Sequence, residues 1–127
     1  MRNVLIVDDS PTMRRLIIFS LKKFADFKIV EAGNGLEALQ KISTDPFGLF
    51  LVDINMPEMN GLEFIQNLRK SPGYDRVPII VITTEGSEED KRKAYEAGAT
   101  EYVTKPFQPP ALHGIVERAL QTNEAPR

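Results

Sequence analysis

The sequence predicts an α/β protein with a doubly wound, five-stranded parallel sheet. Five short apolar runs alternate with five segments of helical periodicity, and the connections between them are short. Such connections favour right-handed crossovers, which place helices on both faces of one parallel sheet. Five strands are too few for a closed eight-stranded barrel. We therefore expect an open three-layer sandwich.

Length and composition narrow the possible functions. The 127 residues fit one domain, which we expect at 1–121, followed by a polar and disordered tail at 122–127. The formal net charge of −2, with acidic and basic residues interspersed, argues against nucleic-acid or membrane-surface partners. Without cysteine and with one histidine, His113, the chain cannot form disulfides or a multi-histidine metal site. No apolar run approaches the length of a membrane span, so we expect a cytoplasmic protein.

The five strands are expected at 4–7, 27–32, 49–52, 77–82 and 101–104. The continuous apolar run at 49–52 is typical of a strand buried on both faces, and it leads directly into Asp53. The run at 27–32 alternates apolar and polar residues, which favours an edge strand. Pro78 is tolerated only near the beginning of its strand.

Each helix begins at a recognisable start signal. Ser10 before Pro11, Asn34, Asn60 and Ser87 are expected N-caps, and Pro109 opens the last helix. Gly98 is expected to end the fourth helix in a left-handed conformation. The apolar faces are read from helical spacing. For the first helix they comprise Met13, Leu16, Ile17, Phe19, Ser20, Leu21 and Phe24, with Arg14, Arg15, Lys22 and Lys23 on the solvated side, and for the second Leu36, Leu39 and Ile42.

Polar residues stand where four of the predicted strands end. Their carboxyl ends collect along one edge of a parallel sheet, which is where ligands bind in open α/β sheets. The residues are Asp8 and Asp9, Asp53, Thr83, and Lys105.

Three clustered carboxylates repel one another, and a hard divalent cation removes that conflict. Magnesium takes oxygen ligands, and Asp8 or Asp9 with Asp53 and a following main-chain carbonyl would supply them. Lys105 adds a positive charge and Thr83 a hydrogen-bond donor, so the group forms a receptor for a tetrahedral dianion on Asp53. Aspartate accepts phosphoryl groups as an acyl phosphate, mainly through in-line positioning and charge neutralisation.

With Asp8-Asp9, Asp53, Thr83 and Lys105-Pro106 in place, the chain resembles a response-regulator receiver domain over essentially its whole length, and most of all the stand-alone chemotaxis regulators of the CheY type. The resemblance implies a flavodoxin-like sheet of strand order 2-1-3-4-5. It makes Asp53 the phosphorylation site, assisted by Thr83 and Lys105.

The resemblance also implies a metal site for Mg²⁺, or Mn²⁺, made by Asp8, Asp9, Asp53 and the carbonyl of Asn55. Asp9 would ligate directly and Asp8 largely through water. The peptide bond before Pro106 would be cis.

A two-state switch is implied as well, with Thr83 and Tyr102 as the switch residues. The fourth helix, fifth strand and fifth helix, around Lys91, Tyr95 and Tyr102, would form the surface that changes. Asn55 and Glu85 occupy the positions that tune phosphoryl lifetime, and their identity predicts rapid self-dephosphorylation. Thr84 departs from the small residue common in the family and is expected to hinder Tyr102 from turning inward.

The partners implied are a sensor histidine kinase or its phosphotransfer domain, and a downstream target such as a motor switch or another phosphorelay component. We expect a monomeric switch that transforms no metabolite and acts through protein contacts, since no effector domain follows the last helix. Three alternatives remain. A haloacid-dehalogenase-like phosphatase expects an Asp-x-Asp pair, a flavodoxin-like cofactor binder expects a Ser/Thr/Gly-rich loop, and a phosphate-independent receiver usually lacks one of the acidic or lysine positions.

Overall fold

Five parallel strands form one sheet in the order β2-β1-β3-β4-β5, as predicted. The computed structural model describes residues 2–56 and 59–124, the last three of these for their main chain only. The strands are β1 (Arg2–Val7), β2 (Phe27–Ala32), β3 (Leu49–Val52), β4 (Ile79–Thr83) and β5 (Glu101–Thr104). β2 and β5 are the edge strands, so the alternating pattern of β2 matches its position.

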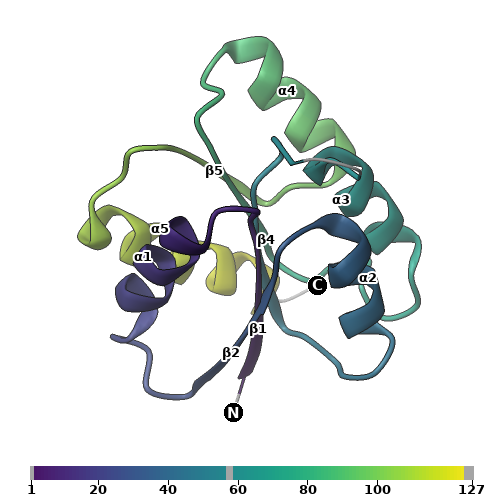
Figure 1. Cartoon of the computed structure of the whole chain (residues 1–127), viewed down its shortest axis with the longest axis horizontal. Helices are drawn as coiled ribbons and strands as arrows, with labels where there is room; N and C mark the ends of the chain where they lie inside the picture. Colours follow the sequence, from purple (N-terminus) through teal and green to yellow (C-terminus); the bar gives the residue numbers. More distant parts are fainter. Residues whose placement is uncertain (1, 57–58, 125–127) are drawn as a thin grey trace.

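Helices cover both faces of the sheet (Figure 1). On one side lie α1 (Pro11–Leu21) and α5 (Pro109–Glu124), and on the other α2 (Gly35–Ile42), α3 (Gly61–Lys70) and α4 (Glu88–Ala97). Each side has its own apolar cluster of buried side chains. The predicted three-layer sandwich is therefore confirmed.

The register of the central strands brings two aspartates to the same level. Val7 of β1 pairs with Val52 of β3, and the main-chain N–H of Asp53 donates to the carbonyl of Val7 at 2.9 Å. Asp8 and Asp53 directly follow these paired residues. Each of these two adjacent parallel strands therefore places a carboxylate at the same edge of the sheet.

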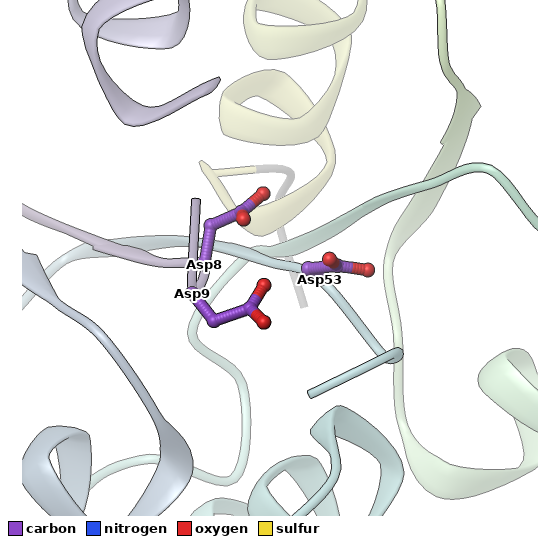
Figure 2. Close-up of side chains that lie close together, drawn as sticks. All are labelled: Asp8, Asp9 and Asp53. Carbon is purple, nitrogen blue, oxygen red and sulfur yellow. The ribbon is translucent and has the colours of Figure 1, made fainter. Parts of the chain in front are cut away.

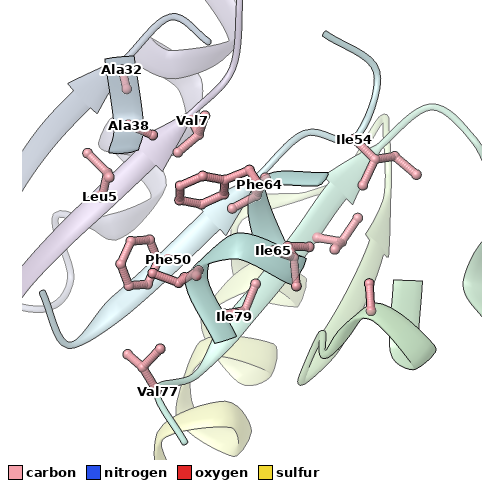
Figure 3. Close-up of a cluster of buried hydrophobic side chains, with 14 of the residues drawn as sticks. Leu5, Val7, Ala32, Ala38, Phe50, Ile54, Phe64, Ile65, Val77 and Ile79 are labelled. Carbon is pink, nitrogen blue, oxygen red and sulfur yellow. The ribbon is translucent and has the colours of Figure 1, made fainter. Parts of the chain in front are cut away.

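The larger core lies between the sheet and α2, α3 and α4 (Figure 3). Phe50 and Phe64 are fully buried at its centre, with ring centroids 6.0 Å apart. Burying an aromatic side chain of this size stabilises a fold by about 1.5–3 kcal/mol. This packing holds α3 against β3, the strand that leads into Asp53.

The predicted start and stop signals of the helices are confirmed. Ser10, Asn34, Asn60 and Ser87 each cap a helix by accepting a hydrogen bond from a main-chain N–H three residues on. Gly98 follows α4 with a φ of 123°, which a residue with a Cβ adopts only under strain. The local chemistry of these positions sets the helix boundaries.

The apolar faces expected for α1 and α2 include residues that are exposed in the structure. Phe19 and Leu16 of α1 are 64% and 38% exposed, and Leu36 of α2 is 47% exposed. Of the residues expected on this face, α1 buries Ile17, Ser20 and Leu21, because a helix that contacts one sheet face can bury only one arc of its surface. The predicted positions of Phe19, Leu16 and Leu36 were therefore wrong.

Several expected boundaries also differ. β1 begins at Arg2 and not at 4. β4 begins at Ile79 and not at 77, because Pro78 has no N–H to join the ladder. α5 continues to Glu124, so residues 122–124 are helical where a tail was expected, and 125–127 lie outside the described residues. None of the helices in the described part of the chain is long and apolar enough to cross a membrane.

Candidate functional site

Three carboxylates meet at the carboxyl edge of the sheet (Figure 2). Oxygen atoms of Asp8, Asp9 and Asp53 lie within 4.8 Å of one another. Asp8 and Asp53 are buried, with 1% and 6% of their surfaces exposed, while Asp9 is exposed to solvent. The cluster is thus open on one side, through Asp9.

Lys105 supplies the positive charge of the site. Its ammonium lies 2.9 Å from Asp8 Oδ2 and 3.4 Å from Asp53 Oδ2, and its side chain is only 10% exposed. Its main-chain N–H donates to the carbonyl of Thr83 at 2.7 Å, which fixes the start of the loop after β5 to the end of β4. The peptide bond between Lys105 and Pro106 is cis, as the resemblance implied.

Burial raises the pKa of Asp53 above its ordinary value. The main-chain N–H of Asn55, which donates to Asp53 Oδ1 at 3.0 Å, and the nearby Lys105 act in the opposite direction, whereas Asp8 raises the pKa further. The cluster holds three carboxylates, and the ammonium of Lys105 contacts two of them, so negative charge is in excess. Oxygen donors in this arrangement suit a hard divalent cation, and the site fits Mg²⁺ by the chemistry of its ligands.

The loop after β4 connects the site to its surroundings through Glu85. Thr83 is fully buried, and its Oγ1 accepts a hydrogen bond from the N–H of Glu85 at 3.3 Å. The side-chain amide of Asn55 donates to Glu85 Oε1 at 2.8 Å. The two residues assigned to phosphoryl lifetime are therefore in direct contact.

Tyr102 reaches the same loop from β5. Its hydroxyl donates to the carbonyl of Glu85, and its ring lies half-buried beside Tyr95, with centroids 6.5 Å apart. Burial raises the pKa of Tyr102 to about 12, so this hydroxyl stays a donor at neutral pH. The side chain of Thr84 is exposed, and its influence on Tyr102 stays a prediction.

The sequence pattern known as the response regulator receiver domain matches residues 4–117. The chain belongs to this family. Among its relatives, the chemotaxis protein CheY1 of Helicobacter pylori is 40% identical over 122 residues, which is 95% of this chain and 98% of that protein. The CheY homologue of Campylobacter jejuni is 39% identical over 120 residues, or 94% and 92% of the two chains.

A solved structure agrees with these relatives. Chemotaxis protein CheY4 of Vibrio cholerae superposes with a TM-score of 0.88 at 38% identity, covering 94% of this chain and 99% of that one. The receiver domain described here therefore has the CheY-like, flavodoxin-like fold that the resemblance implied.

Sequence reasoning missed two residues of this receiver domain. Arg14 was expected on the solvated side of its helix, but its guanidinium donates to the main-chain carbonyl of Asp8 and lies 2.8 Å from Glu31 Oε1. A Cβ on Gly61 would stand 2.4 Å from the carbonyl oxygen of Asp53. The signal for Gly61 was its place directly after the N-cap Asn60. Nothing local in the sequence marks Arg14.

Proposed function

We propose that this protein is the response regulator of a two-component system, accepting a phosphoryl group on Asp53 in the presence of Mg²⁺. One observation carries the proposal: Asp53 ends a buried central strand, with Lys105 at 3.4 Å and two further carboxylates within 4.8 Å. The donor would be a phosphohistidine of a sensor kinase or of its phosphotransfer domain. The proposal describes a signalling switch that turns over its own phosphoryl group and transforms no metabolite.

The chemistry follows from the surroundings of each Asp53 oxygen. A carboxylate oxygen attacks phosphorus, the O–P bond forms, and the P–N bond breaks with its electron pair returning to the imidazole of the donor. Asp53 Oδ2 faces Lys105, while Oδ1 is held by the N–H of Asn55. Lys105 is thus placed to bind a phosphoryl oxygen, and the buried Thr83 to donate to another.

The metal would be held by Asp8, Asp9, Asp53 and the carbonyl of Asn55. When bound, Mg²⁺ or Mn²⁺ supplies charge neutralisation for the carboxylates and for the phosphoryl oxygens during transfer. Lys105 alone leaves a net negative site, so a phosphoryl dianion would be repelled without this additional charge.

Output would use the surface formed by α4, β5 and α5. The loop that carries Glu85 contacts Asn55 on the site side and Tyr102 on the surface side. Movement of Thr83 toward a phosphoryl group would shift this loop, and with it Tyr102, Tyr95 and Lys91. We expect a target protein of chemotaxis type because the relatives named above are chemotaxis proteins.

The phosphorylated form should be short-lived. Asn55 and Glu85 are polar and hydrogen-bonded to each other beside the site, so neither shields the acyl phosphate with apolar surface. Rapid loss of the phosphoryl group after donor removal is the expected result, followed by intact-mass measurement over time. A phosphorylated form that persists for hours would contradict it.

The phosphorylation itself is tested with acetyl phosphate and Mg²⁺. We expect the mass of one phosphoryl group to be gained and peptide mapping to place it on Asp53. Asp53→Asn should gain none, and removal of Mg²⁺ with EDTA should suppress the gain in the unaltered protein. An equal mass gain in Asp53→Asn would overturn the assignment of the acceptor.

A further inference from the structure

The three carboxylates of the site are held in different ways. Asp8 accepts hydrogen bonds from the N–H of Ser10 and from Lys105, both at 2.9 Å. Asp53 accepts from the N–H of Asn55 at 3.0 Å. Asp9 is exposed, and within the described part of the chain its carboxylate has no hydrogen-bond or ion-pair partner. The position of the Asp9 carboxylate therefore depends on the main chain around it.

Two peptide groups flank Asp9, and a side chain holds each of them. The N–H that follows, on Ser10, donates to Asp8 Oδ1. The carbonyl that precedes, on Asp8, accepts from Nη1 of Arg14. Because these two peptide planes set the direction of the Asp9 Cα–Cβ bond, Arg14 and the Asp8 carboxylate together aim the Asp9 side chain into the cluster.

Arg14 is itself firmly placed. Its side chain is 18% exposed, and its Nε donates to Glu31 Oε1 of β2 at 2.8 Å. Its own N–H donates to the carbonyl of Ser10 in the first turn of α1 at 3.0 Å. One planar guanidinium thus connects α1, β2 and the end of β1. A lysine ammonium keeps the charge but lacks the rigid fork that makes both contacts at once.

We propose that Arg14 is a positioning residue for the metal site, which acts by holding the Asp8 carbonyl and thereby the exposed ligand Asp9. The inference rests on the proposed function, because it assigns Asp9 to metal binding. The inference also predicts the direction in which metal affinity changes when Arg14 is replaced. If Arg14 acted only through its charge, its removal would strengthen binding of a cation. If Arg14 positions Asp9, its removal weakens binding.

The test is a titration of the full-length chain with Mn²⁺, followed by electron paramagnetic resonance of the free ion, and then competition by Mg²⁺. For Arg14→Gln we expect metal affinity to fall by about tenfold, the usual scale for a residue that orients metal ligands. Arg14→Lys should also weaken binding although the charge is unchanged. At saturating metal, the rate of phosphorylation by acetyl phosphate should recover in both variants.

Arg69→Gln is the matched control. Arg69 is also a half-buried helix arginine that holds a main-chain carbonyl, donating to Gly98 at 3.0 and 2.7 Å, but it lies near the far end of α3 from the site. Its replacement should lower the unfolding temperature while leaving metal affinity within about twofold of the unaltered protein. Circular dichroism checks that each variant is folded. If Arg14→Gln does not fold, Arg14→Lys tests the inference in its place.

Three results would overturn the inference. If both Arg14 variants bound metal as tightly as the unaltered protein, or more tightly, the role of Arg14 would be rejected. The metal site itself would not be affected by that result. An equal loss of affinity in Arg69→Gln would reduce that role to general stability. No metal binding in the unaltered protein would reject the metal site itself, and this inference with it.

Discussion

The two edges of the sheet, at the carboxyl and at the amino ends of its strands, hold their polar groups in opposite ways. At the carboxyl edge, Asp8 and Asp53 are buried against the single ammonium of Lys105, and burial raises the pKa of Asp53. At the amino edge, the loops satisfy their own main chain. The Tyr74 hydroxyl accepts from the N–H of Phe47 at 3.1 Å, and the amide of Asn3 donates to the carbonyl of Pro46 at 2.8 Å.

This difference indicates that the carboxyl edge, and not the amino edge, lowers the stability of the fold. Polar atoms at the amino edge have neutral partners at ordinary distances, and removing one should cost stability and nothing else. The carboxylates at the carboxyl edge repel one another, and removing Asp53 or Asp9 should cost function but not stability. The variants below test that division, in order of decreasing effect on the free energy of unfolding.

Gly61→Ala should lower the free energy of unfolding most, because the new Cβ would overlap main-chain atoms at the carboxyl edge of the sheet. The new Cβ would stand 2.4 Å from the carbonyl oxygen of Asp53 and 2.5 Å from Cα of Ile54, both main-chain atoms. We expect a loss of about 3 kcal/mol in the free energy of unfolding, the upper end for overpacking. Phosphorylation should also slow, because Asp53 is displaced. Urea unfolding and acetyl phosphate labelling measure the two effects.

Gly114→Ala provides the control for Gly61→Ala. A Cβ on Gly114, in α5, meets nothing within 4 Å. Alanine is favoured over glycine in a helix by about 0.8–1 kcal/mol, so this variant should be more stable than the unaltered protein. If Gly61→Ala unfolded at the same urea concentration as the unaltered protein, the close approach of α3 to Asp53 would not matter.

Asp53→Asn should stabilise the protein although it destroys the proposed phosphorylation site. The pKa of Asp53 is raised in the folded state, so the folded form binds its proton more tightly than the unfolded form does. Stability is therefore lost as pH rises from the unfolded pKa, about 3.9, through the folded one. At pH 7 without metal, we expect a gain of about 1–2 kcal/mol, the scale of a buried polar group without full compensation.

The gain from Asp53→Asn should shrink as pH falls toward about 4, because the carboxyl group becomes neutral in both states. Urea unfolding in EDTA at several pH values measures this trend. A loss of stability at pH 7, or a gain that grows in acid, would mean that the attraction of Lys105 outweighs burial.

The sequence predicted the carboxyl edge well, because its information is local. A strand that ends in Asp53 and a cap at Asn60 are each recognisable within a few residues, and parallel topology brings the strand ends together. The direction of a helix face depends on neighbours far along the chain. Phe19 and Leu16 therefore followed helical spacing and were still misplaced.

Arg14 shows the same limit within the site. It contacts the main chain of Asp8 and the side chain of Glu31 on β2, and these contacts exist only once α1 is docked beside both strands. A basic residue on a helix is usually solvated, so the pattern gave no reason to single it out. Local rules locate the residues of the proposed phosphorylation site, and tertiary packing decides which other residues contact them.

Tyr74→Phe tests the amino edge. The change removes the hydroxyl that accepts from the N–H of Phe47, and we expect a loss of about 1 kcal/mol in the free energy of unfolding. Phosphorylation and metal affinity should not change. Tyr95→Phe is the control, because Tyr95 is 47% exposed and its change should stay within about 0.5 kcal/mol. A slower phosphorylation of Tyr74→Phe would mean that the two edges are coupled.

Asp9→Asn should change the free energy of unfolding least. Its loss of the response to Mg²⁺ should still distinguish the carboxyl edge from the amino edge. Asp9 is exposed and unpartnered among the described residues, so in EDTA the free energy of unfolding should change by no more than about 0.5 kcal/mol. Mg²⁺ at a hundred times its dissociation constant should stabilise the unaltered protein by about 2.7 kcal/mol, because it binds the folded state. Most of that stabilisation should disappear in Asp9→Asn.

Asp26→Asn is the matched change at the other edge, since Asp26 is an exposed aspartate in the loop between α1 and β2. It should be neutral in EDTA and should keep the full response to Mg²⁺. Thermal unfolding with and without metal distinguishes the two aspartates. If both variants kept that response, Asp9 would not be a ligand, and the exposed side of the carboxylate cluster would have no part in binding the metal. If both lost it, Mg²⁺ would be acting through general screening of negative charge.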